Sequence, residues 1–188
     1  MRHVAAAVLS LLLCGPALAG PVKLKPAEPQ PAAPGPGLSV AYAYPEQKIH
    51  SLAEAATALR GAVRDGKPLR GLDYADTTEG EVTLTSRQAM NVAARITGFV
   101  RFDAPGAYDI EFVVNDGIDA RIGGQQVGFY DGIQACEGTT VVPVEVPVAG
   151  WYPVDILYFQ KQGTACLNMK WGPADGKRSW TPNSAFGR

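Results

Sequence analysis

The chain has 188 residues, 46% of them hydrophobic, and a formal net charge of −1, which suits one globular domain. A charge this close to zero excludes the broad basic surface that nucleic-acid binding needs, and no basic cluster of the membrane-surface kind is present. No run in the chain is apolar for long enough to predict a membrane span.

The first 19 residues have the pattern of a secretory signal peptide. A basic head, Met1-Arg2-His3, precedes an apolar run from Val4 to Leu13, and Ala17-Leu18-Ala19 is a small-residue cleavage signal. We predict cleavage after Ala19 and export, so that the protein is secreted or periplasmic. The alternative makes Cys14 a lipid-attachment site, but Leu13 is larger than the residue such sites prefer.

Residues 20–36 are rich in proline and carry little apolar bulk. We expect this segment to be an extended, solvated linker, with a ligand for a proline-recognition module as the alternative. The domain is then predicted to span residues 37–188.

The domain begins with an alternating run at Ser39–Tyr44 and a helix signal at Ser51-Leu52-Ala53-Glu54, where a hydroxyl and a carboxylate are spaced as in a capping box. Apolar residues at helical spacing predict a helix from about Leu52 to about Val63. Further extended segments are expected at 72–75, 81–84, 95–102, 108–114, 118–122, 125–130, 139–148, 151–160 and 164–171.

Two of these segments show the alternation most clearly, since Ile96, Val100 and Phe102 share one face and Ile110, Phe112 and Val114 share another. Turns such as Gly123-Gly124 separate the short strands. The fold class is therefore all-β, an antiparallel β-sandwich or flattened barrel with one short N-terminal helix.

Signal cleavage leaves two cysteines, Cys136 and Cys166. In an oxidising compartment they are expected to form a disulfide, and the alternative is two free thiols, one of them reactive. His50 is the sole histidine after cleavage and stands beside the predicted helix start, as a surface residue would. We therefore expect no catalytic residues, although a hydrolase using two carboxylates stays open because acidic residues are scattered through the loops.

The order of these features resembles the PA-fourteen domain, a β-sandwich module first described in a bacterial toxin's protective antigen. The resemblance covers residues 37–188 and is carried by these segments: Gly37-Leu38 with Tyr42 and Tyr44, Ile96-Thr97-Gly98-Phe99, Gly106-Ala107-Tyr108-Asp109-Ile110, Asn115-Asp116-Gly117-Ile118, Ala149-Gly150-Trp151-Tyr152, Leu167 to Trp171 and Thr181-Pro182.

The resemblance implies a sugar-binding site at Asn115-Asp116, where sugar-binding members carry two aspartates joined by a cis peptide that hold calcium. Calcium is thus the expected cofactor, with Asn115 and Asp116 as its ligands. The chain departs from the family in having Asn115 in place of the first aspartate and Gly123-Gly124 where Asp-Gly is usual. In the neighbouring loop, Asp131 and Gly132 are expected as further ligand-binding residues. Phe129 and Tyr130 either form an aromatic wall against a sugar face or pack in the core or at its rim.

The same Asn115-Asp116-Gly117 segment is also typical of an ordinary turn, because Asn and Asp hydrogen-bond their own backbone there. Besides the two-carboxylate hydrolase, two functions remain open on the sequence. The first is a non-catalytic binding module for a glycan or cell-envelope polysaccharide, assisted by calcium. The second is a structural or interaction module whose partner is a cell-envelope protein, with no metal or sugar site.

Overall fold

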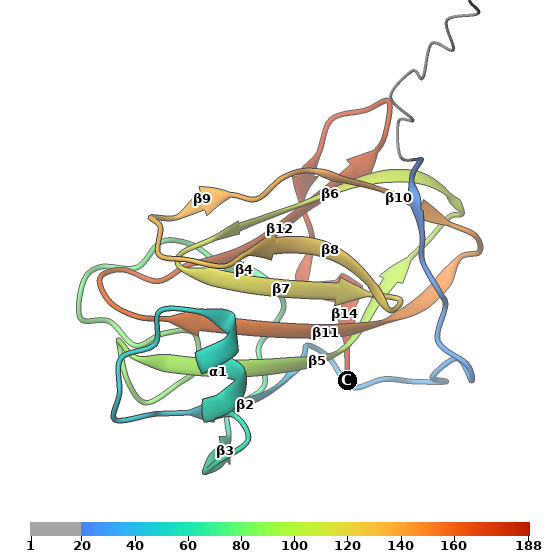
Figure 1. The fold of residues 1–188 in the computed structure, drawn as a ribbon. Helices are drawn as coiled ribbons and strands as arrows, with labels where there is room; N and C mark the ends of the chain where they lie inside the picture. The colour runs from blue at the N-terminus through green and yellow to red at the C-terminus, as the bar shows by residue number, and fades with distance from the viewer. Residues whose placement is uncertain (1–19) are drawn as a thin grey trace, which may run out of the picture.

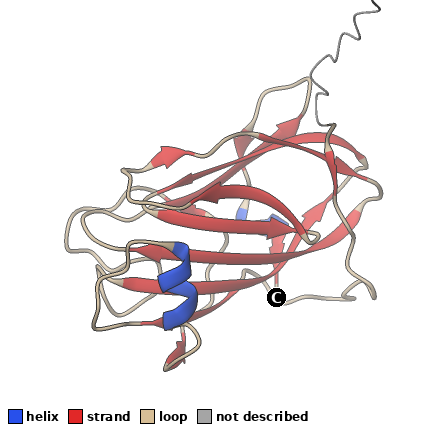
Figure 2. Cartoon of the chain, viewed as in Figure 1, coloured by secondary structure: helices blue, strands red, loops and turns tan. Residues whose placement is uncertain are grey.

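The computed structural model describes residues 20–188, so the predicted signal peptide lies outside the described part. Two β-sheets pack face to face, and the helix α1 (Leu52–Ala58) lies against the outside of one of them (Figures 1 and 2). Over residues 20–188 neither sheet closes into a barrel, so the prediction of an antiparallel β-sandwich is confirmed.

The first sheet, sheet A, runs in the order β1 (Val22–Lys23), β10 (Val142–Val146), β6 (Gly106–Val114), β12 (Leu167–Pro173) and β13 (Ser179–Trp180), with β4 (Asp73–Tyr74) beside β12 and β9 (Glu137–Gly138) beside β6. The second, sheet B, runs in the order β3 (Val63–Asp65), β2 (Ser39–Ala43), β5 (Val92–Phe102), β11 (Gly150–Gln160), β7 (Gly117–Ile122) and β8 (Gln125–Tyr130), with β14 (Phe186–Gly187) beside β5. A short 3₁₀ turn, η1 (Asn183–Ala185), precedes β14.

The core lies between the sheets and follows the predicted alternation. Ile96 and Phe102 of β5 point inward and are fully buried, and Ile110 and Phe112 of β6 meet them from sheet A. The ring of Phe102 packs edge-on against Tyr108 of β6, with 5.2 Å between the ring centroids. Each such side chain contributes about 1.5–3 kcal/mol of hydrophobic stabilisation, so these faces hold the two sheets together.

Helix α1 is shorter than predicted, because it ends at Ala58 rather than near Val63. Its residues Leu52 and Ala55 are buried against Phe159 on the outer face of sheet B. After the helix the chain turns, and residues 63–65 pair with β2 as the edge strand β3. The backbone there gains sheet hydrogen bonds that another helical turn would not provide.

Residues 81–84, expected as an extended segment, form no strand. The hydroxyl of Thr83 donates to the carbonyl of Ala89, and that of Ser86 donates to the carbonyl of Gln88. Such local side-chain bonds compete with sheet pairing and favour a turn.

The proline-rich segment 20–36, called the N-terminal strap below, is extended as predicted, but it is not the solvated linker that its composition suggested. Its strand β1 pairs with β10 in parallel, and Leu24 is buried in the main core. Further along, the amide of Ala27 donates to the Trp151 carbonyl at 2.8 Å, and Gln30 both donates to and accepts from the Trp151 backbone. The strap therefore spans from sheet A to sheet B and covers one end of the sandwich (Figure 1).

The predicted hairpin turn at Gly123-Gly124 is confirmed, and the strap crosses it. Both glycines have positive φ, 55° and 76°. A Cβ on Gly123 would lie 2.6 Å from the backbone nitrogen of Lys25, so a larger residue there would displace the strap.

Candidate functional site

The loops at one end of sheet B form the candidate site. They comprise residues 45–50 after β2, residues 90–91 before β5, the turn at 115–116 before β7, residues 131–136 after β8 and residues 161–165 after β11. The turn at Gly123-Gly124 and the N-terminal strap lie at the opposite end of the sandwich (Figure 1).

Asp116 ties two of these loops to the strand ends. It is 1% exposed and has a φ of +59°, the left-handed conformation that Asp and Asn tolerate better than most residues. One carboxylate oxygen accepts the amide of Lys161 at 2.7 Å, and the other accepts the amide of Gln134 at 3.3 Å. The Asp116 amide in turn donates to the Gln134 carbonyl at 3.3 Å. The residue therefore fastens loops 131–136 and 161–165 through their backbones.

The next residue explains why this turn ends in glycine. A Cβ on Gly117 would lie 2.1 Å from the ring of Phe159, which packs under helix α1. Any larger residue would push the Asn115-Asp116 turn away from the sheet.

Burial raises the pKa of the Asp116 carboxyl above its usual 3.8, although the amides of Lys161 and Gln134 act in the opposite direction. Burial also raises the pKa of Tyr158 well above its usual value, and the nearby Asp116 charge adds to that shift. The site is therefore a weakly solvated environment in which a negative charge is held by backbone amides.

Asn115 is 5% exposed, and its backbone amide donates to the Cys166 carbonyl at 3.2 Å. Its side-chain oxygen is buried and has no hydrogen-bond partner among the described residues. The peptide bond to Asp116 is trans, since the described chain has a single cis peptide, at Glu28-Pro29.

These residues allow a test of the calcium site that the resemblance implied. Calcium takes about 6–8 oxygen ligands. Here the Asn115 side chain offers one free oxygen, while both oxygens of Asp116 already accept backbone amides. Within residues 20–188 the sole cluster of three His, Cys, Asp or Glu side chains close enough to share a metal is Asp76 with Cys136 and Cys166, two cysteines that are bonded to each other. As arranged, the Asn115 and Asp116 side chains supply three of the about 6–8 oxygens that calcium takes, and two of these three already accept backbone amides.

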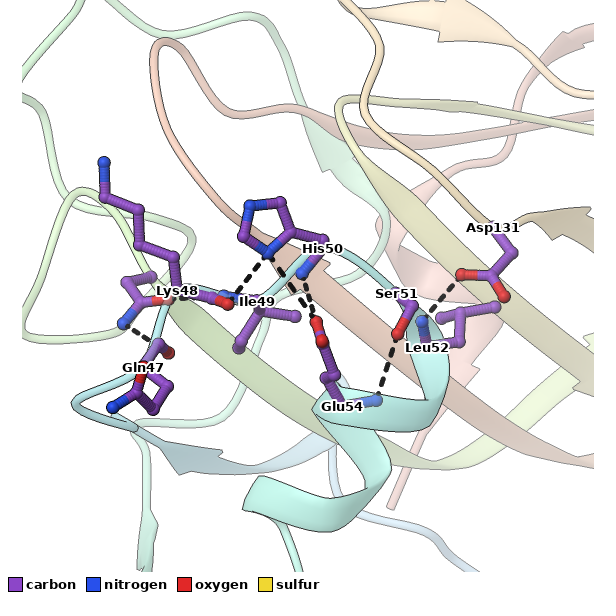
Figure 3. Close-up of polar contacts among 9 residues, drawn as sticks. Gln47, Lys48, Ile49, His50, Ser51, Leu52, Glu54 and Asp131 are labelled. Atoms are coloured by element: carbon purple, nitrogen blue, oxygen red, sulfur yellow. Dashed lines mark hydrogen bonds and ion pairs between the residues drawn. The ribbon is translucent and has the colours of Figure 1, made fainter.

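Asp131, predicted to bind ligand, caps helix α1. Its carboxylate accepts the amide of Leu52 at 2.7 Å (Figure 3). The predicted capping box is also present: the Ser51 hydroxyl accepts the amide of Glu54 at 3.3 Å, and the Glu54 carboxylate accepts the amide of His50 at 2.6 Å. His50 is exposed at this helix start, as expected.

Replacing Asp131 by alanine is expected to lower the free energy of unfolding by about 1 kcal/mol, the usual cost of losing a capping side chain. The measurement is urea unfolding at neutral pH, with Glu137→Ala in the same region as a control that should change little. A loss as small as the control's would contradict the capping role.

The predicted aromatic wall is not formed. Phe129 is 51% exposed on the outer face of β8, opposite Asp119. Tyr130 packs against the main core, and its hydroxyl donates to the Ile133 carbonyl at 3.3 Å. Successive residues of a strand face opposite sides, so these two rings cannot line one wall, and Gly132 lies in the loop beyond them.

Asn91 is a structural residue of the site that sequence reasoning missed. Its side-chain amide donates to the Pro45 carbonyl at 2.6 Å and to the Gln47 carbonyl at 3.2 Å, while its oxygen accepts the amide of Ile49 at 3.0 Å. Its own amide donates to the Lys161 carbonyl at 3.1 Å. With a φ of +56°, Asn91 holds loop 45–50 against loop 161–165. An asparagine directly before an apolar strand is the one signal the sequence offered.

Between these loops lies a hollow of about 600 Å³, called the loop hollow below. Most residues that line the loop hollow are polar, with charges of both signs, and one exposed apolar side chain, Met90, joins them. The lining residues are Glu46, Lys48, Glu79, Met90, Asn91, Lys161, Gln162 and Gly163. None of the residues predicted to bind metal or ligand lines the loop hollow.

The predicted disulfide is present. Cys136 is bonded to Cys166, with 5.9 Å between the Cα atoms, and joins loop 131–136 to the start of β12. Neither sulfur is therefore a free nucleophile. Within residues 20–188 the structure has no helix that could cross a membrane.

Comparison with known proteins agrees with this fold. The sequence model of the PA14 domain, the PA-fourteen domain of the sequence analysis, matches residues 72–184, more than half of the chain. A search of curated proteins finds no match.

Among solved structures, the PA14 domain of the antifreeze protein MpAFP is 14% identical with a TM-score of 0.68, over 84% of this chain and 92% of that one. The PA14 sugar-binding domain of an RTX adhesin is 17% identical with a TM-score of 0.64, over 81% and 98%. The A domain of epithelial adhesin 9 from Candida glabrata, solved with Galβ1-3GlcNAc, is 13% identical with a TM-score of 0.65, over 89% and 95%. The fold and the match over residues 72–184 together place this chain in the PA14 domain family.

Proposed function

We propose that this domain is a non-catalytic glycan-binding module and that the glycan occupies the loop hollow. The proposal is supported by membership of the PA14 family and by two similar structures, one named as sugar-binding and one solved with a disaccharide. The observation that carries it is the loop hollow itself, because its loops are fixed in advance by Asn91 and Asp116. A site whose loops are already ordered loses less entropy when it binds.

The lining of the loop hollow suits sugar hydroxyls. Glu46 and Glu79 offer acceptors, Lys48 and Lys161 offer donors, and Gln162 offers both. Met90 is 47% exposed and provides an apolar surface for the C–H face of a ring. A volume of about 600 Å³ lies within the range of about 300–1,000 Å³ of small-ligand sites.

We also propose that binding does not require calcium and that the domain works outside the cytoplasm. The first point is supported by the Asp116 oxygens, each of which already accepts a backbone amide. The second is supported by the Cys136–Cys166 disulfide, a bond that forms and persists in oxidising compartments.

The test is binding of the purified protein to a glycan array, once with calcium and once with EDTA, followed by titration of the best glycan. Replacing Lys161 and Gln162 by alanine should weaken binding by about tenfold or more, since one hydrogen bond to a charged group is worth about 1.5–3 kcal/mol. The backbone amide of Lys161, which Asp116 needs, is kept in this variant.

The matched control replaces Lys23 and Lys25, two exposed lysines of the N-terminal strap at the opposite end of the sandwich. It should bind like the parent. If no glycan is retained, or if the double variant binds normally, the loop hollow is not a glycan site, and the domain is better studied as an interaction module for a cell-envelope protein. Binding that disappears with EDTA would overturn the calcium-independent part of the proposal.

A further inference from the structure

The hairpin between β12 and β13 forms part of one edge of sheet A, at a different place from the loop hollow. Lys170 pairs with Trp180 and Trp171 with Ser179 across the two strands. A Cβ on Gly172 would lie 2.6 Å from the Lys177 carbonyl oxygen, so only glycine allows the hairpin to approach this closely. The amide of Ala174 donates to the Ala107 carbonyl at 3.0 Å and anchors the hairpin to strand β6.

Beneath the hairpin, ion pairs fix the charged side chains. Arg178 Nε donates to Glu111 Oε2 at 3.3 Å, and its Nη1 lies 3.6 Å from the carboxylate of Asp109. Lys170 Nζ lies 4.0 Å from the same oxygen of Glu111. The side chains of Asp109, Glu111, Lys170 and Arg178 are each at least half-buried. Together they form an ordered charged cluster, called the floor of the hairpin below.

Trp180 stands beside this floor with 55% of its surface exposed, the largest exposed fraction of any large hydrophobic residue in the described chain. The ammonium of Lys170 lies 4.5 Å from the centroid of its ring, a cation–π contact that fixes the indole. A hollow of about 660 Å³ lies here, lined by Glu111, Lys170, Gly176, Lys177, Arg178, Ser179 and Trp180, and is called the Trp180 hollow below.

The charges of the Trp180 hollow indicate the kind of ligand. Three basic side chains, Lys170, Lys177 and Arg178, line it against one acid, Glu111. Within residues 20–188, Lys177 has no acidic group at ion-pair distance, so its charge is available for a ligand. A carboxylate on the ligand would gain a charge-assisted hydrogen bond there.

We propose that the Trp180 hollow is a second saccharide site and that it takes an acidic sugar, a pyranose bearing a carboxylate. The indole of Trp180 packs against the apolar C–H face of the ring. Lys177 binds the carboxylate, and Glu111 and Arg178, already positioned by their ion pair, exchange hydrogen bonds with hydroxyls. The volume suits one or two sugar units, within the range of about 300–1,000 Å³ for small-ligand sites.

This site is separate from the one proposed above. The loop hollow lies between loops that follow or precede strands of sheet B, whereas the Trp180 hollow lies on sheet A. The two sites share no residue, so either can fail without the other.

The test is titration of the purified protein with digalacturonate, observed through its tryptophan indole N–H signals by NMR. The signal of Trp180 should shift saturably, whereas those of Trp151 and Trp171 should move little. Trp180→Ala should weaken binding by at least about tenfold, and Lys177→Ala by about threefold to tenfold. The loop-hollow variant, with Lys161 and Gln162 replaced by alanine, should bind digalacturonate like the parent.

Two results would overturn the proposal. A Trp180 signal that does not move, or that moves equally with the same concentration of sodium chloride, would show that no saccharide site exists there. Equal binding of neutral lactose, or unchanged affinity in Lys177→Ala, would remove the preference for an acidic sugar.

Discussion

Replacing Asp116 by alanine is expected to lower the free energy of unfolding by about 3–6 kcal/mol, because a hydrogen bond to a charged group is worth about 1.5–3 kcal/mol and two are lost. The amides of Lys161 and Gln134 would lose their acceptor in a part-buried region. Both loops that Asp116 fastens should then become less ordered. The measurement is urea unfolding, with amide hydrogen exchange at Lys161 and Gln134 to locate the change.

The matched control is Asp103→Ala, because Asp103 forms only an exposed ion pair with Arg101 and should matter by less than about 1 kcal/mol. A loss in Asp116→Ala no larger than that of the control would contradict the fastening role.

Millimolar calcium should leave the melting temperature of the parent unchanged. A saturable rise would mean that the turn rearranges around a metal, since a ligand that binds only the folded state stabilises it.

The pH dependence of the same residue has a definite sign. Burial raises the folded-state pKa of Asp116 above its usual 3.8, so the folded state takes up this proton more readily than the unfolded state does. The stabilisation that comes from this proton uptake is therefore fully present below pH 3.8. It is lost as the pH rises through the folded-state pKa. The difference in stability between the parent and Asp116→Asn should shrink over that interval. A difference that grows with pH would contradict this sign.

Removing the disulfide is the second large change. The free energy of unfolding of the variant Cys136→Ser/Cys166→Ala is expected to be about 3–4 kcal/mol lower than that of the parent. This is the chain-entropy value for the loop that the bridge closes, since the cysteines are 30 residues apart. Alanine is chosen at position 166 because Cys166 is fully buried and a hydroxyl there would need a partner. For a domain of this size the melting temperature should fall by roughly 6–16 °C.

The chemical control for this variant is reduction of the parent, which should lower its stability to the level of the double variant. Mass spectrometry of a non-reduced digest should show a peptide linking Cys136 to Cys166. A stability loss below about 1 kcal/mol would contradict the prediction, because the bridge would then add little to the constraint on the unfolded chain.

Sequence reasoning located the strands well where side chains alternate over many residues. Ile96 and Phe102 illustrate this, because burial of one face fixes both the strand and its orientation. It failed for β1 and β3, two short strands that exist because β10 and β2 offer them edges to pair with. A proline-rich composition gives no hint that Leu24 reaches the core.

The site residues were harder to predict, because their roles depend on contacts distant in sequence. Asp131 caps a helix that begins 79 residues earlier, and Asn91 binds backbone atoms up to 46 residues before it. The turn at Asn115-Asp116 was placed correctly at a strand end, but the pattern could not show that Asp116 would be engaged by backbone amides. Trp180 lies in a short hairpin whose position depends on Gly172, and periodicity says nothing about it.

The N-terminal strap also determines how a tethered molecule would be oriented. It docks at the end of the sandwich that carries the Gly123-Gly124 turn, and the C-terminal Arg188 exchanges backbone hydrogen bonds with Gly35 of the strap. A support attached ahead of Gly20 therefore holds the domain by the end remote from the loop hollow. Attachment at the N-terminus is accordingly the geometry for immobilised binding experiments.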